Sequence, residues 1–411
     1  MADDPQTSAP AATAGPPRIA RGTREYRAVS IAFFSCGFNI FAMLYCTQSI
    51  LPLLAQEFSV SPAESSLALS LTTIVMAVSM LFASSVSEAV GRKPLMLAAL
   101  VASSVLTLVL AFSNQWQHVL WLRALTGLTL SGMPAVALAY LAEEMEPSSV
   151  PPAVGLYIGG GAVGGMMGRL IPAFFADYAG SWRMAMAAIA VCGLLSAIVF
   201  WHALAPSRHF VARALSPVAL VGSLLAHLRN GAIVLLITMG FLMLGSFMVL
   251  FNYIGFRLQG APFNLSQAVA GLVFIVYPLG SFASAWMGSL AGRFGRGRMI
   301  LVSLAITIAG LLLLAPDSLV TLVLGLALVT FGFFGAHAIA SGWAPALAEG
   351  QKAQASSLYL LVYYIGGGVA GTLGGYFWEG WGWTGVVVFS GAMMVITFGL
   401  AIQMWRVAKV Q

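Results

Sequence analysis

The sequence predicts an all-α membrane protein in which twelve transmembrane helices form two pseudo-symmetric bundles of six helices. Three observations lead to this fold class. Hydrophobic residues make up 60% of the 411 residues and charged residues only 8%, which is too little charge to cover the surface of a soluble protein of this size. Twelve apolar stretches approach the roughly 20 residues that a helix needs to cross a bilayer. Finally, segments half a chain apart are closely similar, which indicates an internal duplication.

The duplication is clearest in two glycine-rich segments. Residues 157–165 have the sequence Tyr-Ile-Gly-Gly-Gly-Ala-Val-Gly-Gly, and residues 364–371 have Tyr-Ile-Gly-Gly-Gly-Val-Ala-Gly, at an offset of 207 residues. A second pair, Gly91 with Arg92 and Gly295 with Arg296, has an offset of 204 residues. A duplicated, mostly apolar chain is typical of a transporter built from two halves around a central pathway.

The apolar stretches define the domain organisation. The candidate spans are 29–54, 66–87, 95–113, 119–142, 151–174, 184–204, 232–254, 267–290, 299–315, 319–341, 356–378 and 384–404. We therefore expect a disordered N-terminal tail (1–27), an N-terminal six-helix bundle (28–204), a linker (205–230), a C-terminal six-helix bundle (231–406) and a short C-terminal tail (407–411). The N-terminal tail is rich in Ala, Pro, Thr and Arg and lacks the apolar core of a secretory signal.

The basic residues predict the orientation in the membrane. An even number of spans places both termini on one side, and 15 of the 19 Lys and Arg residues fall on that side. Because cytoplasmic loops carry an excess of Lys and Arg, this side is predicted to be cytoplasmic. We expect a multi-pass protein of the cytoplasmic (inner) membrane, embedded in the lipid bilayer, with both termini and the linker in the cytoplasm.

Several other classes of protein are not expected. There is no soluble basic domain and no clustered basic helix, so nucleic-acid binding is not predicted. The three cysteines, Cys36, Cys46 and Cys192, lie in apolar stretches and are interpreted as packing residues without a disulfide. The sequence has no phosphate-binding loop and no zinc-binding spacing of His or Cys. We expect no enzyme, no metal ion and no cofactor, and the proton gradient is the expected energy source.

The loop between spans two and three carries the most specific motif. Residues 84–93 have the sequence Ser-Ser-Val-Ser-Glu-Ala-Val-Gly-Arg-Lys, and residues 288–296 have Gly-Ser-Leu-Ala-Gly-Arg-Phe-Gly-Arg. With the twelve spans, these segments resemble the major facilitator superfamily, in which the loop has the pattern Gly-x-x-x-Asp-x-x-Gly-Arg-Lys. The resemblance covers nearly all residues after the tail and is closest to the twelve-helix proton antiporters that export drugs and small solutes. Ser84, Glu88 and Gly292 depart from the family pattern.

Two interpretations of this loop are open, a cytoplasmic gate and a simple topology anchor. Gly91 permits a tight reversal of the chain. Glu88 is predicted to pair with the positive N-terminal end of a neighbouring helix, such as span eleven, and Arg92 to reach Glu143 or Glu144 at the end of span four. The predicted gating residues are Glu88, Gly91, Arg92, Lys93, Glu143, Glu144, Gly295 and Arg296.

Span four contains an arginine, Arg123, four residues before Gly127. The superfamily has an Arg at this place, and in its antiporters this Arg is linked to proton coupling. An Arg inside a span is costly unless it is paired or hydrated, so it marks a cavity or a proton route. The alternative is an Arg that extends to the outer interface. The second half has no counterpart, because Leu326 stands at the equivalent place.

Span five carries a glycine pattern. Residues 160–169 resemble the antiporter pattern Gly-x-x-x-Gly-Pro-x-x-Gly-Gly, with Gly165 in place of Pro and Arg169 in place of the last Gly. Glycines four residues apart line one helix face and let a neighbouring helix approach closely. The predicted packing residues are Gly160, Gly164, Gly168, Arg169, Gly367 and Gly371. Two interpretations of Arg169 are equally supported: it lines the transport pathway, or it packs in the interface between helices.

The resemblance places the substrate cavity among spans one, four, seven and ten. Polar residues on these spans are expected to face inward, because polar groups facing lipid are penalised. The predicted substrate-binding residues are Asn39, Tyr45, Gln48, Arg123, Asn252, Tyr253, His337, Tyr363 and Tyr364. His337 is a candidate for proton coupling beside Arg123, since a His titrates near neutral pH. The alternative is a core His bonded to a backbone carbonyl.

The sequence supports three hypotheses for function. The first is proton-coupled export of a small organic solute or drug by alternating access. The second is uptake or exchange of a small organic anion, because no Asp or Glu lies at the middle of a span and a strictly cationic substrate is therefore disfavoured. The third is a membrane sensor that binds a ligand without transporting it. Since one chain contains both halves of the pathway, a monomer is expected to function with its small-molecule substrate.

Overall fold

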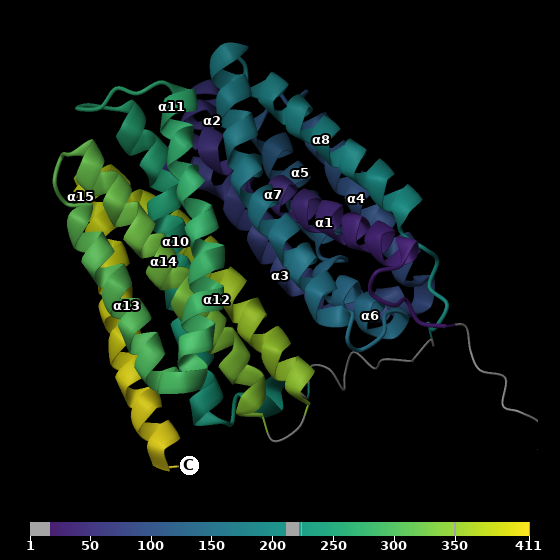
Figure 1. Cartoon of the computed structure of the whole chain (residues 1–411). Coiled ribbons are helices and arrows are strands. Elements are labelled where there is room, and N and C mark those ends of the chain that lie inside the picture. The colour runs from purple at the N-terminus through teal and green to yellow at the C-terminus, as the bar shows by residue number, and fades with distance from the viewer. Residues whose placement is uncertain (1–16, 211–221, 223, 349–350, 411) are drawn as a thin grey trace, which may run out of the picture.

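A computed structural model gives the structure of residues 17–210, 222, 224–348 and 351–410. Almost all of these residues are helical, and Figure 1 shows two helical bundles side by side, the purple-to-teal N-terminal half and the green-to-yellow C-terminal half. The N-terminal half contains α1 (Arg24–Tyr45), η1 (Gln48–Ile50), α2 (Leu51–Phe58), α3 (Pro62–Val90), α4 (Arg92–Leu110), α5 (Trp116–Leu130), α6 (Pro134–Glu144), α7 (Val150–Tyr178) and α8 (Trp182–Ala203). The C-terminal half contains α10 (Gly231–Gln259), α11 (Gln267–Gly271), η2 (Leu272–Val276), α12 (Tyr277–Phe294), α13 (Arg296–Leu313), α14 (Leu319–Trp343), η3 (Ala344–Ala346) and α15 (Lys352–Val410).

The helices provide twelve membrane spans. Ten helical stretches of the described chain are long and apolar enough to cross a membrane. The last of them contains two spans, because Gly382 (φ 59°, ψ −144°) interrupts α15. The helices α5 and α6 together supply the twelfth span, in two pieces. The predicted fold class, twelve helices in two six-helix bundles, is confirmed.

Two spans that the sequence predicts as continuous are interrupted. Residues 131–133 separate α5 from α6 within the predicted span 119–142. Pro134 begins α6, and because it has no N–H to donate, the hydrogen bonds of α5 cannot continue through it. In span one, α1 ends at Tyr45, and η1 and α2 follow, with Pro52 in the first turn of α2. The first break divides span four into two helices, and the second leaves the last carbonyls of α1 without hydrogen-bond partners in their own helix.

Glycines allow the helices of each half to pack closely. A Cβ atom on Gly160 or Gly164 would lie 2.1 Å from a backbone carbonyl oxygen of α1, and one on Gly168 would lie 2.6 Å from a Cα atom of α1. In the other half, a Cβ atom on Gly366 would lie 2.3 Å from the carbonyl oxygen of Phe241 in α10. No side chain fits at these distances, so α1 with α7, and α10 with α15, approach backbone to backbone.

Both ends of the described chain lie at the same end of the molecule, which we call the inner end; the opposite end is the outer end (Figure 1). The turns from α3 to α4 and from α12 to α13 lie at the inner end and have nearly the same conformation, with φ of 95° at Gly91 and 90° at Gly295. Such positive φ angles favour glycine. The duplicated motif therefore builds one turn in each half.

The predicted tails are more ordered than expected. Ile19 is buried, its N–H donates to the carbonyl of Glu144 (2.9 Å), and its carbonyl accepts from the N–H of Glu146 (3.1 Å). The prediction of a disordered tail over 1–27 is therefore wrong from residue 17 onward, because an apolar side chain and backbone bonds tie this segment to the end of α6; residues 1–16 lie outside the described residues. Similarly, α15 continues to Val410, so the predicted tail 407–411 is helical except for the last residue, which lies outside the described residues.

The first part of the linker packs on the N-terminal half. The hydroxyl of Tyr140 donates to the carbonyl of Ala205 (2.8 Å). The carboxylate of Glu144 accepts from the backbone N–H groups of Arg208 (2.6 Å) and His209 (2.8 Å). These bonds hold the start of the linker at the inner end, whereas residues 211–221 and 223 lie outside the described residues.

Candidate substrate site between the two halves

The two halves are joined by hydrogen bonds at the outer end and along the outer part of the spans. The amide of Gln267 in α11 donates to the carbonyl of Ser49 in η1 (2.6 Å), and Figure 1 shows α11 beside α2 at this end. Further inside, the hydroxyl of Thr372 in α15 donates to Ser70 (2.8 Å) and accepts from Ser66 (3.1 Å), both in α3. The halves are therefore closed against each other on the side away from the termini.

Two carboxylates hold this closure in a symmetric way. Asp177, in the last turn of α7, accepts from the backbone N–H of Ala268 (3.1 Å) and from the hydroxyl of Ser266 (2.7 Å) at the start of α11. Glu379, in α15 shortly before its break, accepts from the backbone N–H of Ala63 (3.2 Å) at the start of α3. Each acid thus caps the second residue of a helix in the other half, where the helix dipole favours negative charge. We call this pair of contacts the outer caps.

Arg169 of α7 lies at the contact between the halves and is completely buried. Its Nε donates to the side-chain oxygen of Gln48 (2.5 Å), and its Nη1 donates to the carbonyl of Gly165. The guanidinium carbon lies 3.9 Å from the ring centre of Tyr45 and 4.2 Å from that of Tyr277, which belongs to the other half. Aromatic rings that face a desolvated cation stabilise it by about 2 kcal/mol. The charge is therefore held by rings from both halves, by one side-chain amide and by one backbone carbonyl.

A chain of hydrogen bonds leads from Arg169 across the interface. Gln48 accepts from Arg169 and donates to the side-chain oxygen of Asn252 in α10 (2.7 Å). Three buried polar atoms of this assembly have no hydrogen-bond partner among the described residues: Nη2 of Arg169, Nδ2 of Asn252 and the hydroxyl of Tyr277. All three can donate a hydrogen bond. We refer to Tyr45, Gln48, Arg169, Asn252 and Tyr277 as the Arg169 cluster.

Arg123 has a different environment, although it too is completely buried. Its guanidinium donates to the carbonyls of Met43 (3.0 Å) and Leu44 (2.7 Å) at the end of α1, to the carbonyl of Ala68 in α3 (2.8 Å), and to the sulfur of Cys46 (3.5 Å). The last carbonyls of a helix have no partner within the helix. Arg123 supplies that partner at the break of span one, and the positive charge suits the helix C-terminus.

His337 belongs to an aromatic stack in the C-terminal half. Its Nδ1 lies 3.1 Å from the hydroxyl of Tyr359, and its ring stacks on Tyr363 with ring centres 4.3 Å apart. Tyr363 in turn contacts Tyr364 edge to face at 5.2 Å. The side chain of His337 remains partly exposed. The predicted residues His337, Tyr363 and Tyr364 are thus brought together, and His337 is bonded to a phenol rather than to a backbone carbonyl.

Two other predicted substrate residues lie inside a single half. The amide of Asn39 donates to the carbonyl of Gly193 (2.7 Å) and to Ser104 (3.3 Å), so it ties α1 to α8 and α4. The hydroxyl of Tyr253 donates to the carbonyl of Gly371 (2.9 Å). These contacts hold helices together within each bundle and leave Tyr45, Gln48 and Asn252 as the predicted residues that meet at the interface.

The predicted packing glycines of the second half contact side chains. A Cβ atom on Gly367 would lie 2.7 Å from the side chain of Leu244, and one on Gly371 would lie 2.9 Å from the amide nitrogen of Asn252. Gly371 therefore leaves room for an amide of the Arg169 cluster.

At the inner end the predicted gating residues form only part of the expected network. Arg92 pairs with Glu143 (2.8 Å), whereas Glu144 binds the linker, including the ring of His209 (3.0 Å). One carboxylate oxygen of Glu88 is buried and has no hydrogen-bond partner within the described part of the chain, from which residues 349–350, just before α15, are missing.

The other inner-end residues have separate surroundings. The amine of Lys93 donates to the carbonyls of Trp201 (3.1 Å) and Leu204. In the second half, Gly295 and Arg296 are exposed. The two copies of the motif therefore have the same turn but different side-chain contacts.

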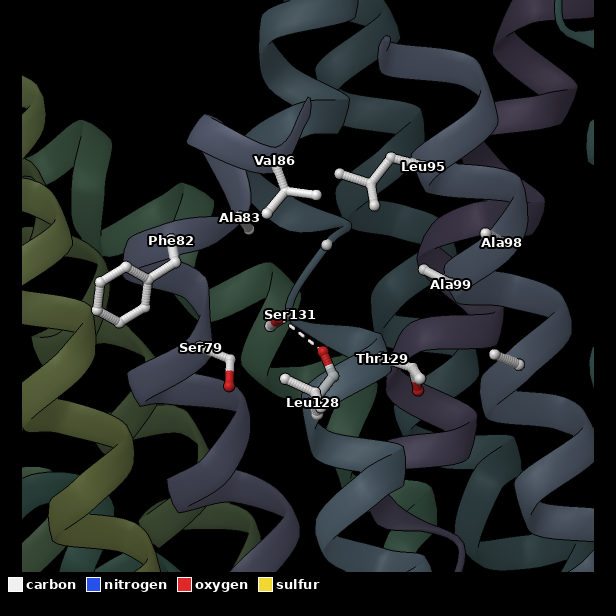
Figure 2. Close-up of a pocket in the computed structure, with 12 residues that line it drawn as sticks. Ser79, Phe82, Ala83, Val86, Leu95, Ala98, Ala99, Leu128, Thr129 and Ser131 are labelled. Carbon is white, nitrogen blue, oxygen red and sulfur yellow. Dashed lines mark hydrogen bonds between the residues drawn. The ribbon is translucent and has the colours of Figure 1, made fainter. Parts of the chain in front are cut away.

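A recess of about 340 Å³ opens at the side of the N-terminal half, among α3, α4 and α5 (Figure 2). Its walls are mostly apolar. Ser131 donates to the carbonyl of Leu128 (2.7 Å) and Thr129 to that of Thr126 (2.8 Å), so these hydroxyls are used within their own segment. The recess therefore offers a polar solute little to bind, in contrast to the Arg169 cluster.

Several residues of the site were not predicted from the sequence. Tyr277 and Phe274, the rings from the second half that face Arg169, lie on span eight, which the family pattern does not place in the cavity. Asp177 and Glu379 carried one available signal: both are acids at the outer end of glycine-rich spans, near the same place in each half. Each accepts from a backbone N–H group, which no side-chain motif marks, and Asp177 also accepts from the hydroxyl of Ser266.

A sequence model of the Major Facilitator Superfamily matches residues 33–261 and 259–409. The chain belongs to the major facilitator superfamily. It is 44% identical over 387 residues to the uncharacterized MFS-type transporter YybF of Bacillus subtilis (strain 168), covering 94% of both chains. It is 45% identical over 388 residues to the inner membrane transport protein YnfM of Escherichia coli (strain K12), covering 94% of this chain and 93% of YnfM.

More distant proteins share the fold. The purine ribonucleoside efflux pump NepI of Shigella sonnei (strain Ss046) is 23% identical over 380 residues, which is 89% of this chain and 92% of NepI. A bacterial homologue of the human lysosomal transporter Spinster, in an inward-facing and unoccupied conformation, is 15% identical with a TM-score of 0.70, covering 93% of this chain and 96% of that one. The nucleoside transporter NupG is 13% identical with a TM-score of 0.73, covering 93% and 99%. The chain is a multi-pass membrane transporter of the superfamily and not an enzyme.

Proposed function

We propose that this transporter exports a small organic solute from the cytoplasm by alternating access, in exchange for protons. The observation that carries the proposal is the closure of the two halves at the outer end, with the outer caps related by the internal duplication. One gate of an alternating-access transporter requires such contacts, which must be strong enough to close a path and few enough to break. The caps join the halves and lie where the halves would separate.

Export is supported by two likenesses. The glycine pattern of span five resembles that of the antiporters, and a distant relative carries the name of an efflux pump. The basic residues at the inner end support a cytoplasmic location for both termini, in the inner membrane that the name of YnfM also mentions. We propose a monomer as the working unit, with no cofactor other than the proton gradient.

For proton coupling we propose His337 and Arg123, as the sequence predicts. His337 is partly exposed and bonded to the phenol of Tyr359, which is a suitable arrangement for proton exchange. Arg123 contacts the break of span one, so its bonds would have to change if that break moves during transport. At the inner end, Glu88 is proposed to find its helix partner when the inner gate closes, because one of its buried oxygens has no partner among the residues that the structure describes. If Glu88→Ala transports solute at the wild-type rate, the motif of residues 84–93 serves only as a topology anchor.

A second candidate is uptake or exchange of a small organic anion. It is favoured by a specific observation, the completely buried Arg169 that forms no ion pair with a described carboxylate. The two candidates differ in direction and coupling, and they share the same scaffold and site.

Everted membrane vesicles that contain the protein test the proposal. The vesicles are energised to acidify the lumen, and cationic, neutral and anionic compounds are added while the lumenal pH is followed. Alkalinisation by one compound, absent in vesicles with no transporter and in His337→Asn, is the expected result for proton-coupled export. Movement of radiolabelled solute by counterflow without any pH response would favour the exchanger instead.

A further inference from the structure

We propose that the Arg169 cluster is the binding site for an anionic group of the transported solute, most simply a carboxylate. The inference rests on the proposed function of small-solute transport and adds the chemical class of the substrate. It starts from the charge of Arg169, which is completely buried between the halves. A cation inside the membrane is costly unless it is paired, so such residues mark substrate or ion pathways.

The described part of the chain provides no anion for this cation. Arg169 forms no ion pair among the described residues. Every described Asp and Glu lies at a helix end or in a connecting segment, and Asp177, the acid in the same helix, already caps α11. The aromatic rings of Tyr45, Phe274 and Tyr277 stabilise the charge. They leave the donors of Nη2 without an acceptor.

The unused polar atoms of the cluster match an anion. Nη2 of Arg169, Nδ2 of Asn252 and the hydroxyl of Tyr277 are buried, lack partners and can each donate. The hydrogen bond from Gln48 to Asn252 and the contact of the guanidinium with the ring of Tyr277, at 4.2 Å, connect the three residues. A carboxylate has two oxygens that accept several hydrogen bonds, and an arginine binds it with its planar N–H groups. A neutral amide could satisfy some of the donors but not the charge.

The location of the donors also suits transport. Arg169 and Gln48 belong to the N-terminal half, and Asn252 and Tyr277 belong to the C-terminal half. An anion that accepts hydrogen bonds from residues of both halves would favour the conformation in which the halves are close. The solute would therefore bind at the point where it stabilises closure of the outer end.

The competing explanation is that Arg169 only clamps the outer end shut through its ring contacts. The two explanations differ in what a bound anion does. We would purify the full chain in detergent and measure the thermal unfolding midpoint with matched probes: acetate and acetamide, succinate and succinamide, benzoate and benzamide, and benzylammonium. We expect at least one carboxylate to raise the midpoint while its amide and benzylammonium do not, because a ligand that binds only the folded state stabilises it.

Two variants assign the effect to the cluster. Tyr277→Phe deletes a hydroxyl that has no partner, so the midpoint without ligand should stay unchanged. The carboxylate concentration that gives half of the maximal rise in the unfolding midpoint should then be about tenfold higher than for wild type, as expected for a lost hydrogen bond to a charged group. Arg169→Gln should abolish the carboxylate effect. No stabilisation by any carboxylate, equal stabilisation by an amide, or an undiminished effect in Arg169→Gln would each overturn the inference.

Counterflow in proteoliposomes separates this inference from the proposed function. Radiolabelled acetate, succinate, benzoate, benzamide and benzylamine are used as probes. Movement of a carboxylate in wild type and not in Arg169→Gln supports both proposals. Movement of benzamide or benzylamine alone retains a small-solute transporter and overturns the anion site. No movement of any probe, with carboxylate-specific stabilisation still present, would leave the site in place and count against the proposed transport of small organic solutes of these classes.

Discussion

Two buried arginines of the N-terminal half, Arg123 and Arg169, show how the same side chain can serve structure or chemistry. Both are completely buried in membrane-spanning helices. Arg123 makes four hydrogen bonds, three of them to backbone carbonyls of α1 and α3. Arg169 makes two with described residues, and its Nη2 has no partner among them. The difference teaches that burial alone does not identify a functional charge; what matters is whether every nitrogen of the guanidinium has a hydrogen-bond partner within the described chain.

The largest expected effect is on the fold, from Arg123→Ala. The change leaves the carbonyls of Met43, Leu44 and Ala68 without their partner, and unsatisfied backbone groups in a membrane protein cost several kcal/mol. We expect a loss of about 3 kcal/mol or more in stability, measured as a lower thermal unfolding midpoint and a lower yield of monodisperse protein. Arg169→Gln is the matched control.

The same residue tests proton coupling. Arg123→Lys keeps the positive charge at the end of α1 and should fold better than Arg123→Ala. If Arg123 takes part in coupling, this folded variant should lose the pH dependence of transport. Unchanged pH dependence would restrict Arg123 to its structural role and would sharpen the contrast with Arg169.

The next effect is on transport, from Arg169→Gln. We expect transport to fall about 100-fold, since removing a charged hydrogen-bonding partner costs about 3 kcal/mol. The unfolding midpoint should change much less than in Arg123→Ala, because few bonds of the chain depend on Arg169. Uptake of radiolabelled solute and thermal unfolding are measured on the same preparations. If Arg169→Gln lowers the unfolding midpoint strongly but each folded molecule transports at the wild-type rate, Arg169 is the structural residue and the contrast with Arg123 is wrong.

A smaller effect is expected from Gln48→Leu. Leu keeps the volume but removes both the acceptor for Arg169 Nε and the donor to Asn252. We expect an apparent affinity for the solute about tenfold lower, with little change in maximal rate, measured by the concentration dependence of counterflow. Gln48→Glu is the informative counterpart, since an added carboxylate would pair with Arg169 and compete with an anionic solute.

The smallest effect is expected at the outer caps. Asp177→Asn and Glu379→Gln keep an acceptor oxygen but remove the charge at the start of α11 or α3. Each should weaken closure by about 1 kcal/mol, which is roughly a fivefold change in population. Spin labels at Ser59 and Ala315, exposed positions of the two halves, would show a longer distance for the open outer end. If each single variant increases the population with the longer distance, and the double variant changes the free energy of closure by the sum of the two single changes, the two caps are independent. If neither variant changes the distance distribution, other contacts hold the outer end closed.

The pattern of the sequence predicted the spans well because membrane crossing depends on local composition. The repeats at 157–165 and 364–371 predicted close helix packing, and Gly91 and Gly295 predicted equivalent turns, since each depends on a residue type at one position. The pattern also selected Tyr45, Gln48 and Asn252, which meet at the interface, because polar residues are rare in membrane helices.

Other parts of the site depend on contacts between distant segments. The ring of Tyr277 faces Arg169 only because span eight of one half packs against span five of the other. Asn39 has the same polar character as Asn252, but it bonds to Gly193 and stays inside its own half. Nothing in the neighbouring sequence distinguishes these two amides.

The sequence by itself determined that this protein spans the membrane with twelve helices in two related halves, and that charged side chains inside the membrane are few. These properties follow from the free energy of transferring side chains from water to lipid, which depends on the composition of each segment alone. Only the tertiary structure decided that Arg123 caps a broken helix while Arg169 keeps unused donors between the halves. The assignment depends on which backbone carbonyls, rings and amides lie within hydrogen-bonding distance, and those partners come from other helices.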